Sequence, residues 1–156
     1  MNKKIKAWYF SHTKKLGYGD NRRIVVGRTH TAKFPVNFYN GWLCRDELID
    51  KPYACKAGLH GSVLPLSAYG YKFFFNNRIY VWRVELSGAM DFGDDKIAAE
   101  KRTYLWGYDA TNVLNRFEDI CTKKEGCVYL DHGWAEFEKQ NRRLYRMLME
   151  GRAANV

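Results

Sequence analysis

Four cysteines and four histidines are the residues of this chain whose types and spacing could hold a metal ion. Four residues separate Cys55 from His60, and the same spacing separates Cys127 from His132. Two cysteines and two histidines can close a tetrahedral zinc site. No C-x-x-C pair is present, and free cysteines often pack as small apolar side chains. We therefore expect no metal centre, with zinc as the weaker alternative, and no disulfides.

Common catalytic motifs are absent from the sequence. It contains no G-x-x-x-x-G-K-[ST] phosphate loop, no H-E-x-x-H and no G-x-S-x-G. An H-x-[ST] phosphoesterase pair is also missing, because His30 is followed by Thr31 and then Ala32. The residues alone therefore predict no catalytic site, and whether the chain is an enzyme stays open.

Positive charge is concentrated in the first 33 residues. The chain holds 26 Lys and Arg against 17 Asp and Glu, a formal net charge of +9. Residues 1–33 contain nine of these bases, and Asp20 is the single acid among them. Such an excess is typical of proteins with an anionic partner. The candidate nucleic-acid-binding residues in this segment are Lys14, Lys15, Arg22, Arg23 and Arg28.

A second group of bases lies in the last predicted helix. Lys139, Arg142, Arg143 and Arg146 have the i, i+3, i+4, i+7 spacing that places side chains on one helical face. This stripe either binds phosphates or is a solvated face whose charge neighbouring glutamates reduce. The residues expected near the opposite, packed face are Trp134, Phe137, Leu144, Tyr145, Leu148 and Met149.

Aromatic residues are interleaved with the N-terminal bases. Aromatic rings can stack on nucleobases while cations hold the phosphates, although these rings can equally belong to the core. The predicted partner is therefore nucleic acid or an acidic protein surface, and not a membrane. The aromatic residues concerned are Trp8, Tyr9, Phe10, Tyr18, Phe34, Phe38 and Tyr39.

Composition and length indicate a single folded domain. With 46% apolar and 28% charged residues, the chain does not belong to the disordered or low-complexity classes. A length of 156 residues suits one hydrophobic core. No apolar stretch approaches the roughly 18 residues of a membrane span, and the first lysines precede no apolar signal segment. We expect a soluble, cytoplasmic protein.

Hydrophobic patterning predicts strands first and long helices last. Residues 78–88 alternate most regularly, with Tyr80, Trp82, Val84 and Leu86 on one face. Asp109 can cap a following helix. Strands are predicted at residues 4–11, 78–88 and 97–106, with a turn at 91–96 between the last two. Residues 34–46 are expected to be irregular with one candidate strand, and residues 63–71 to form one or two helical turns.

These elements predict a single α+β domain over residues 1–156. It comprises a basic N-terminal segment (1–33), a β-rich core (52–106) and C-terminal helices at about 109–121 and 134–150. The sheet is expected to be twisted and mainly antiparallel, with a short helix after residue 62.

Three blocks of sequence resemble a family of small uncharacterised proteins found mostly in phages and prophages. The blocks are CKAGLHGS (55–62), VWRVELSG (81–88) and GDDKIAAE (93–100). In order, they are similar to the family's C-x-x-G-[LF]-H-[AG] turn, its V-E-[LV]-x-G strand end and its D-D-K followed by an apolar segment. The resemblance covers residues 55–105 and implies kinship without implying a reaction. For a phage protein, the cytoplasm would be that of the host cell.

The order of elements also resembles, more distantly, the ADP-ribosyltransferase fold. That resemblance implies NAD as a cofactor, with His12, Arg28 and His60 as nucleotide-binding residues. His12 or Arg28 would bind the pyrophosphate through charge-assisted hydrogen bonds. Ser62 would orient the nicotinamide ribose, and Glu100 would stabilise the oxocarbenium-like centre. For His60 the alternative is a residue that fixes a turn by hydrogen bonding.

Two classes of function follow from these observations. The leading hypothesis is a phage-type accessory protein that binds nucleic acid or a host nucleic-acid machine, in host takeover or counter-defence. The alternative is an ADP-ribosyltransferase-like enzyme or a nucleotide-binding protein. A protein–protein adaptor that uses its basic face against an acidic surface is the third hypothesis.

Overall fold

The computed structural model describes residues 3–16, 20–54, 56–71, 78–125 and 133–155. The predicted α+β fold, with an antiparallel sheet, a short helix after residue 62 and two C-terminal helices, is confirmed. The elements follow in the order β1 (Ile5–Ser11), β2 (Thr29–Thr31), β3 (Val36–Asn40), β4 (Arg45–Ile49), β5 (Leu59–Gly61), α1 (Pro65–Tyr69), β6 (Tyr80–Phe92), β7 (Ile97–Asp109), α2 (Thr111–Glu125) and α3 (Trp134–Ala154).

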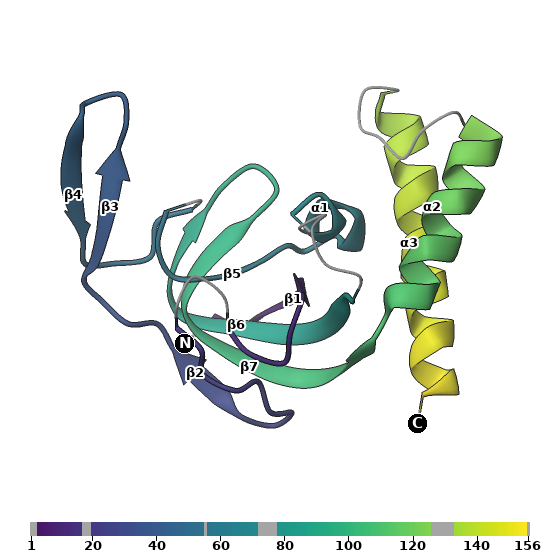
Figure 1. Cartoon of the computed structure of the whole chain (residues 1–156), viewed down its shortest axis with the longest axis horizontal. Helices are drawn as coiled ribbons and strands as arrows, with labels where there is room; N and C mark the ends of the chain where they lie inside the picture. The colour runs from purple at the N-terminus through teal and green to yellow at the C-terminus, as the bar shows by residue number, and fades with distance from the viewer. Residues whose placement is uncertain (1–2, 17–19, 55, 72–77, 126–132, 156) are drawn as a thin grey trace.

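The long hairpin of β6 and β7 is the centre of the fold. β1 pairs antiparallel with β6 along its whole length, and β2 and β5 pair with the other edge of β7. Just after β5, Ser62 exchanges two backbone hydrogen bonds with Trp8 of β1, at 2.7 and 3.0 Å. The strands β1, β6, β7 and β5 therefore close into a ring, and Figure 1 shows the curled sheet that results.

Each face of the curled sheet has its own core, because alternate strand residues point to opposite sides. The helix face carries Trp8, Phe10 and Val81 and is covered by α1, α2 and α3. The inner face of the ring is covered by the described parts of the loop 12–28 (residues 12–16 and 20–28), through the buried Leu16 and Ile24. The inner-face residues of the strands include Ala7, Trp82, Val84, Leu86 and Tyr104.

The two C-terminal helices are held to the end of β7. The Asp109 carboxylate accepts a hydrogen bond from the Thr111 backbone N–H (3.0 Å), as expected for a residue that caps α2. The Tyr108 hydroxyl donates to the Leu148 carbonyl of α3 (2.7 Å). Both helices extend four residues beyond their predicted ends. In the ranges that the structure describes, no helix combines the length and apolarity needed to cross a membrane.

The packed face of α3 differs from the predicted one at two positions. Trp134 and Tyr145, expected to be buried, are 67% and 48% exposed. Both residues lie at the edges of the apolar face of α3. The spacing of apolar residues along a helix does not show which part of that face packs against the sheet. The buried residues of α3 are Phe137, Gln140, Leu144, Met147 and Leu148.

Residues 34–46, expected to be irregular with one candidate strand, contain β3 and the start of β4, which pair as an antiparallel hairpin. The candidate strand is present as β3, but the irregular part of the expectation was wrong, because Pro35 precedes β3 and Asn40 ends it, so neither interrupts it. The Asn40 side chain accepts a hydrogen bond from the Trp42 backbone N–H (3.1 Å) and so stabilises the turn. The hairpin projects from the ring on the side away from α2 and α3 (Figure 1).

Candidate nucleic-acid interface

A groove of about 480 Å³ opens where the loop 12–28 meets the start of β6 and the end of β7. It brings together Lys14 and Arg23, both predicted to contact nucleic acid, with Arg78, which was not predicted. The lining residues are Lys14, Arg23, Ile24, Val25, Val26, Arg78, Tyr80, Trp82, Gly107, Tyr108 and Asp109.

Two stacked aromatic rings form part of the groove wall. The ring centroids of Tyr80 and Trp82 are 6.3 Å apart, with an angle of 27° between the ring planes. The Trp82 indole N–H donates a hydrogen bond to the Ser11 hydroxyl (2.8 Å). On its other side the ring lies against Gly107, where an added Cβ would be 2.2 Å from Trp82 Cε3. The indole is thus held in place before any ligand arrives.

The groove carries positive charge that the described part of the chain does not neutralise. Lys14, Arg23 and Arg78 form no ion pair with any described carboxylate. Asp109 lines the groove, but its Oδ1 already accepts hydrogen bonds from the Thr111 backbone N–H (3.0 Å) and hydroxyl (2.5 Å). Because none of the three cations is paired with Asp109, the groove keeps a net positive charge that an anionic ligand can meet.

The backbone of the loop determines where its cations lie. Leu16 N–H donates to the Arg22 carbonyl (2.9 Å), and Ile24 N–H donates to the Lys14 carbonyl (2.8 Å). The Leu16 and Ile24 side chains are buried in the inner-face core. Since neighbouring side chains of this paired segment point to opposite sides, Arg23 is left exposed at the groove.

The other predicted bases of the N-terminal segment lie outside the groove lining. Arg22 donates two hydrogen bonds to the Asp20 carboxylate, at 2.6 and 2.8 Å, and this contact lowers the pKa of Asp20. Lys33 approaches the same carboxylate at 3.8 Å. Lys15 and Arg28 are exposed. Arg22 is therefore neutralised, whereas Lys15 and Arg28 can extend the positive surface beside the groove.

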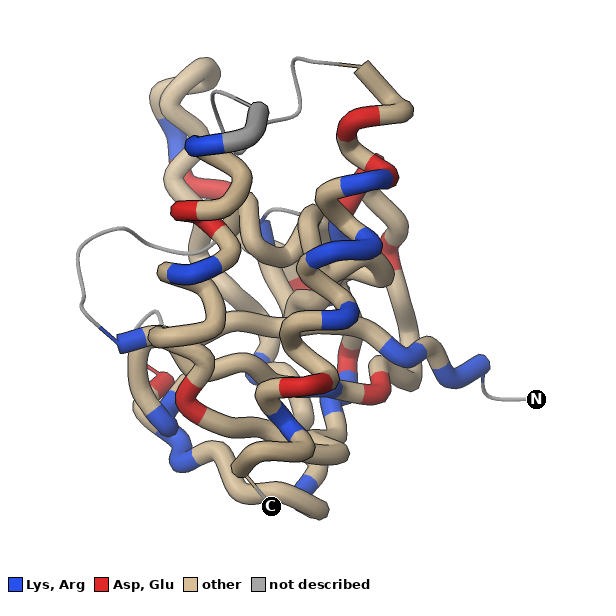
Figure 2. The backbone as a smooth tube through the Cα atoms, turned by 90° about the vertical axis from the view of Figure 1, so that its right-hand side faces the viewer, with Lys and Arg blue, Asp and Glu red and all other residues tan. Residues whose placement is uncertain are grey.

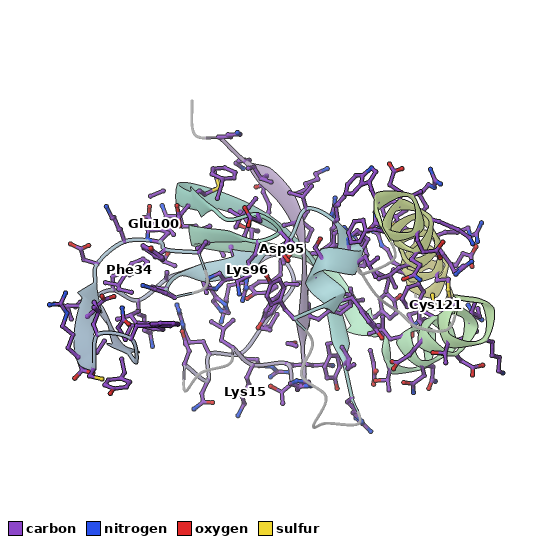
Figure 3. The ribbon with its side chains drawn as sticks, turned by 90° about the horizontal axis from the view of Figure 1, so that it is seen from above. Lys15, Phe34, Asp95, Lys96, Glu100 and Cys121 are labelled. Carbon is purple, nitrogen blue, oxygen red and sulfur yellow. The ribbon has the colours of Figure 1, made fainter. Side chains whose placement is uncertain are left out.

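The predicted basic stripe of α3 does not join this surface. α3 packs on the helix face of the sheet, and the loop 12–28 packs on the inner face. Figure 2 shows the bases distributed along α3, and in Figure 3 Cys121 of α2, which Arg143 contacts (3.4 Å), lies far from Lys15. Lys139 approaches Glu136 at 3.9 Å. The two basic groups predicted from the sequence are thus on opposite faces.

No family model, curated protein or solved structure matches the chain. Its own residues and their geometry are therefore the basis for assigning a function. The structure also shows where the described residues of the ADP-ribosyltransferase and zinc alternatives lie.

The residues of the ADP-ribosyltransferase alternative lie apart. The His12 ring is 3.4 Å from the Arg78 carbonyl, near the start of β6. Glu100 accepts a hydrogen bond from Ala89 N–H (3.1 Å), near the other end of the same strand. At about 3.3 Å per strand residue, the nine steps from Tyr80 to Ala89 place the two roughly 30 Å apart along β6. Ser62 is buried and bridges to β1, so the structure does not gather these side chains into one site.

His60 lies in β5, and its buried Nε2 atom has no hydrogen-bond partner in the described part of the chain. Burial and, to a smaller extent, the charges of Lys96 and Arg102 lower its pKa to about 4, so it is neutral near pH 7. Its carbonyl accepts a hydrogen bond from Arg102 (2.6 Å). Among the residues that the structure describes, no group of three or more potential metal ligands occurs. The other residues of the zinc alternative, Cys55, Cys127 and His132, lie outside the described ranges.

Two groove residues, Arg78 and Tyr80, were absent from the predicted site. Both belong to the most regular predicted strand, where Tyr80 was expected to share a face with Trp82. The available signal was an arginine directly before an aromatic strand face. This signal indicates a binding site only when the loop 12–28 is known to lie over that face. That packing is a contact between distant parts of the chain.

Proposed function

We propose that the chain binds single-stranded nucleic acid in the groove between the loop 12–28 and β6. The observation that carries this proposal is the arrangement of Lys14, Arg23 and Arg78, without carboxylate partners among the described residues, around a preformed aromatic stack. A single strand offers the complementary chemistry, since its phosphates pair with cations and its unpaired bases stack on aromatic rings.

Tyr80 is the ring that a base would use. Trp82 is only 4% exposed, whereas Tyr80 is half-buried, and the Lys14 ammonium lies 5.6 Å from the Tyr80 ring centroid. A base that stacks on Tyr80 takes the place of this ammonium. Lys14 then turns to the adjacent phosphate, so that stacking and charge pairing occur together. The flat faces of paired bases inside a duplex are covered, which favours a single strand.

An acidic protein surface is the competing partner. It would pair with the same cations but would place no base on the Tyr80 ring, which is why nucleic acid fits the groove better. A role as a phage-type accessory protein, acting on nucleic acid or on a host nucleic-acid machine, is compatible with this binding and forms part of the proposal.

The test is fluorescence anisotropy with labelled oligothymidylate and oligouridylate of about 15 nucleotides, which suits a small site. The affinity is measured over a series of salt concentrations. Three phosphate contacts predict a slope of log K against log salt of about −2, because each contact contributes about −0.7 for single strands. The triple variant Lys14→Gln, Arg23→Gln, Arg78→Gln should bring the slope close to zero.

A matched control removes the same charge from the other face of the sheet. The triple variant Arg116→Gln, Lys139→Gln, Arg146→Gln, at exposed positions of α2 and α3 that line neither cavity, also lowers the net charge by three, yet it should leave the slope unchanged. Salt-independent binding, or an equal loss of slope in both variants, would contradict the groove as the site. Binding of an acidic peptide with no binding of either oligonucleotide would assign the groove to a protein partner.

A further inference from the structure

A second cavity, of about 300 Å³, lies on the helix face between the sheet, the start of α1 and α3. It is separate from the proposed nucleic-acid groove, with which it shares no lining residue. Apolar and aromatic walls surround two arginines. The lining residues are Trp8, Val63, Leu64, Pro65, Arg83, Asn141, Arg142 and Tyr145.

Arg83 is the unusual residue of this cavity. It occupies a helix-face position of β6, between its neighbours Trp8 of β1 and Trp106 of β7. Its guanidinium lies 4.6 Å from the centroid of the Trp8 ring. Nη1 is buried and has no hydrogen-bond partner among the described residues. A guanidinium stays charged in proteins, so the buried Nη1 of this half-buried residue is a charged donor without an acceptor.

No carboxylate lines the cavity to balance this charge. Arg142 adds a second cation at the opposite wall. The next acidic residue along the same face of β6, Glu85, forms an ion pair with Lys4 at 2.9 Å. A buried donor without a partner costs free energy, and two guanidinium groups around one apolar space raise that cost. An anion in the cavity would remove both penalties.

The remaining polar side chains of the wall are positioned and available. Asn141 Oδ1 accepts a hydrogen bond from the Leu66 backbone N–H at the start of α1 (3.0 Å), which fixes the side chain. Tyr145 packs edge-on against Trp8, with ring centroids 5.9 Å apart, and remains 48% exposed. Its hydroxyl is a further hydrogen-bond donor. The cavity thus combines positive charge, hydrogen-bond donors and apolar walls.

We propose that this cavity is a binding site for a phosphate monoester or for inorganic phosphate. A doubly charged phosphate matches two arginines, and guanidinium groups bind its oxygens through paired, charge-assisted hydrogen bonds. The apolar walls of Trp8, Leu64 and Pro65 strengthen these contacts by lowering the local dielectric. The proposal does not rest on nucleic-acid binding in the groove, because the two sites share no residue.

The experiment uses the full chain in thermal-shift and calorimetric titrations at constant ionic strength. The ligands are sodium phosphate, adenosine 5′-monophosphate and adenosine, which carries no phosphate. Phosphate and the nucleotide should each raise Tm, whereas adenosine should not. Tighter binding of the nucleotide than of inorganic phosphate assigns a phosphate ester as the ligand, and equal binding assigns free phosphate. A chain whose Tm responds to neither overturns the proposal.

Arg83→Met separates a ligand-binding role from a structural one. Methionine has a similar volume and no charge, so without phosphate the variant should keep or increase its Tm. Its phosphate-dependent rise in Tm should disappear, with a Kd at least about tenfold weaker. Arg142→Gln, a change at an exposed position, should weaken phosphate binding in the same direction without affecting folding.

The matched control is Arg152→Met. The Arg152 guanidinium lies 4.5 Å from the centroid of the Trp106 ring on the same face of the sheet, but Arg152 does not line the cavity. This variant should bind phosphate like the unmodified chain. If Arg83→Met lowers Tm and keeps the phosphate effect, Arg83 is a structural residue and the proposed site is wrong.

Discussion

Acidification should destabilise the fold through His60, a neutral, half-buried residue of β5. In the folded chain its pKa falls from 6.5 to about 4, first because of burial and then because of Lys96 and Arg102. In the unfolded chain the imidazole has its ordinary pKa. As the pH falls below that value, the unfolded state binds a proton that the folded state does not, and stability decreases until the pH reaches the folded pKa.

The size of this loss follows from the two pKa values. Between about pH 7 and pH 5, a histidine with pKa 6.5 unfolded and about 4 folded lowers the free energy of unfolding by about 2 kcal/mol. His30, whose pKa is lowered mainly by burial, contributes in the same direction. Most carboxylates remain ionised in this window, so the decrease should come chiefly from these two imidazoles.

Urea denaturation at several pH values measures the effect, with His60→Gln as the variant. Glutamine cannot be protonated, so the variant should lose about 2 kcal/mol less than the unmodified chain when the pH falls from about 7 to 5. His30→Gln serves as the comparison for the second imidazole. Equal pH dependence in the His60→Gln variant and the unmodified chain would show that the His60 ring is protonated as readily in the folded state as in the unfolded state.

Two further predictions concern the packing that holds the groove and the helices. Gly107→Ala should lower the free energy of unfolding by about 1–3 kcal/mol, because its Cβ would meet the fixed Trp82 ring at 2.2 Å; unchanged urea denaturation would show that the ring can move aside. Tyr108→Phe should cost about 1 kcal/mol, because Leu148 loses its hydrogen bond from the Tyr108 hydroxyl (2.7 Å). A cost near zero, measured in the same way, would mean that water replaces the hydroxyl.

The fold could be predicted where the hydrophobic pattern of a segment matches the surroundings of that segment in the folded chain. Alternation in β6 assigned Tyr80 and Trp82 to one face, and that face does lie inside the ring apart from the helices. The closure of the ring was not predictable, because Ser62 and Trp8 are joined by backbone hydrogen bonds that carry no side-chain signature. The exposure of Tyr145 was missed for a similar reason, since its environment depends on how α3 is rotated against the sheet.

The candidate groove was predictable only in part. Charge counting identified Lys14 and Arg23, but a count along the sequence contains no information about faces. It therefore grouped the N-terminal bases with those of α3, which lie on the opposite side of the sheet. Arg78 and Arg83 were missed because each is a single base in a near-neutral stretch. Their significance comes from their surroundings in space: Arg83 lines a cavity that no carboxylate lines, and Arg78 forms no ion pair with a described carboxylate.

The closure of the ring between β1 and β5 has a mechanical consequence. β1 shares a continuous ladder with β6 on one edge, whereas on the other edge the junction consists of two hydrogen bonds between Trp8 and Ser62. When the ring is strained, the hydrogen bonds between Trp8 and Ser62 should break before any other strand pairing. Trp8 also lines the proposed phosphate cavity, opposite α3. A ligand bound there would therefore stabilise the junction between Trp8 and Ser62.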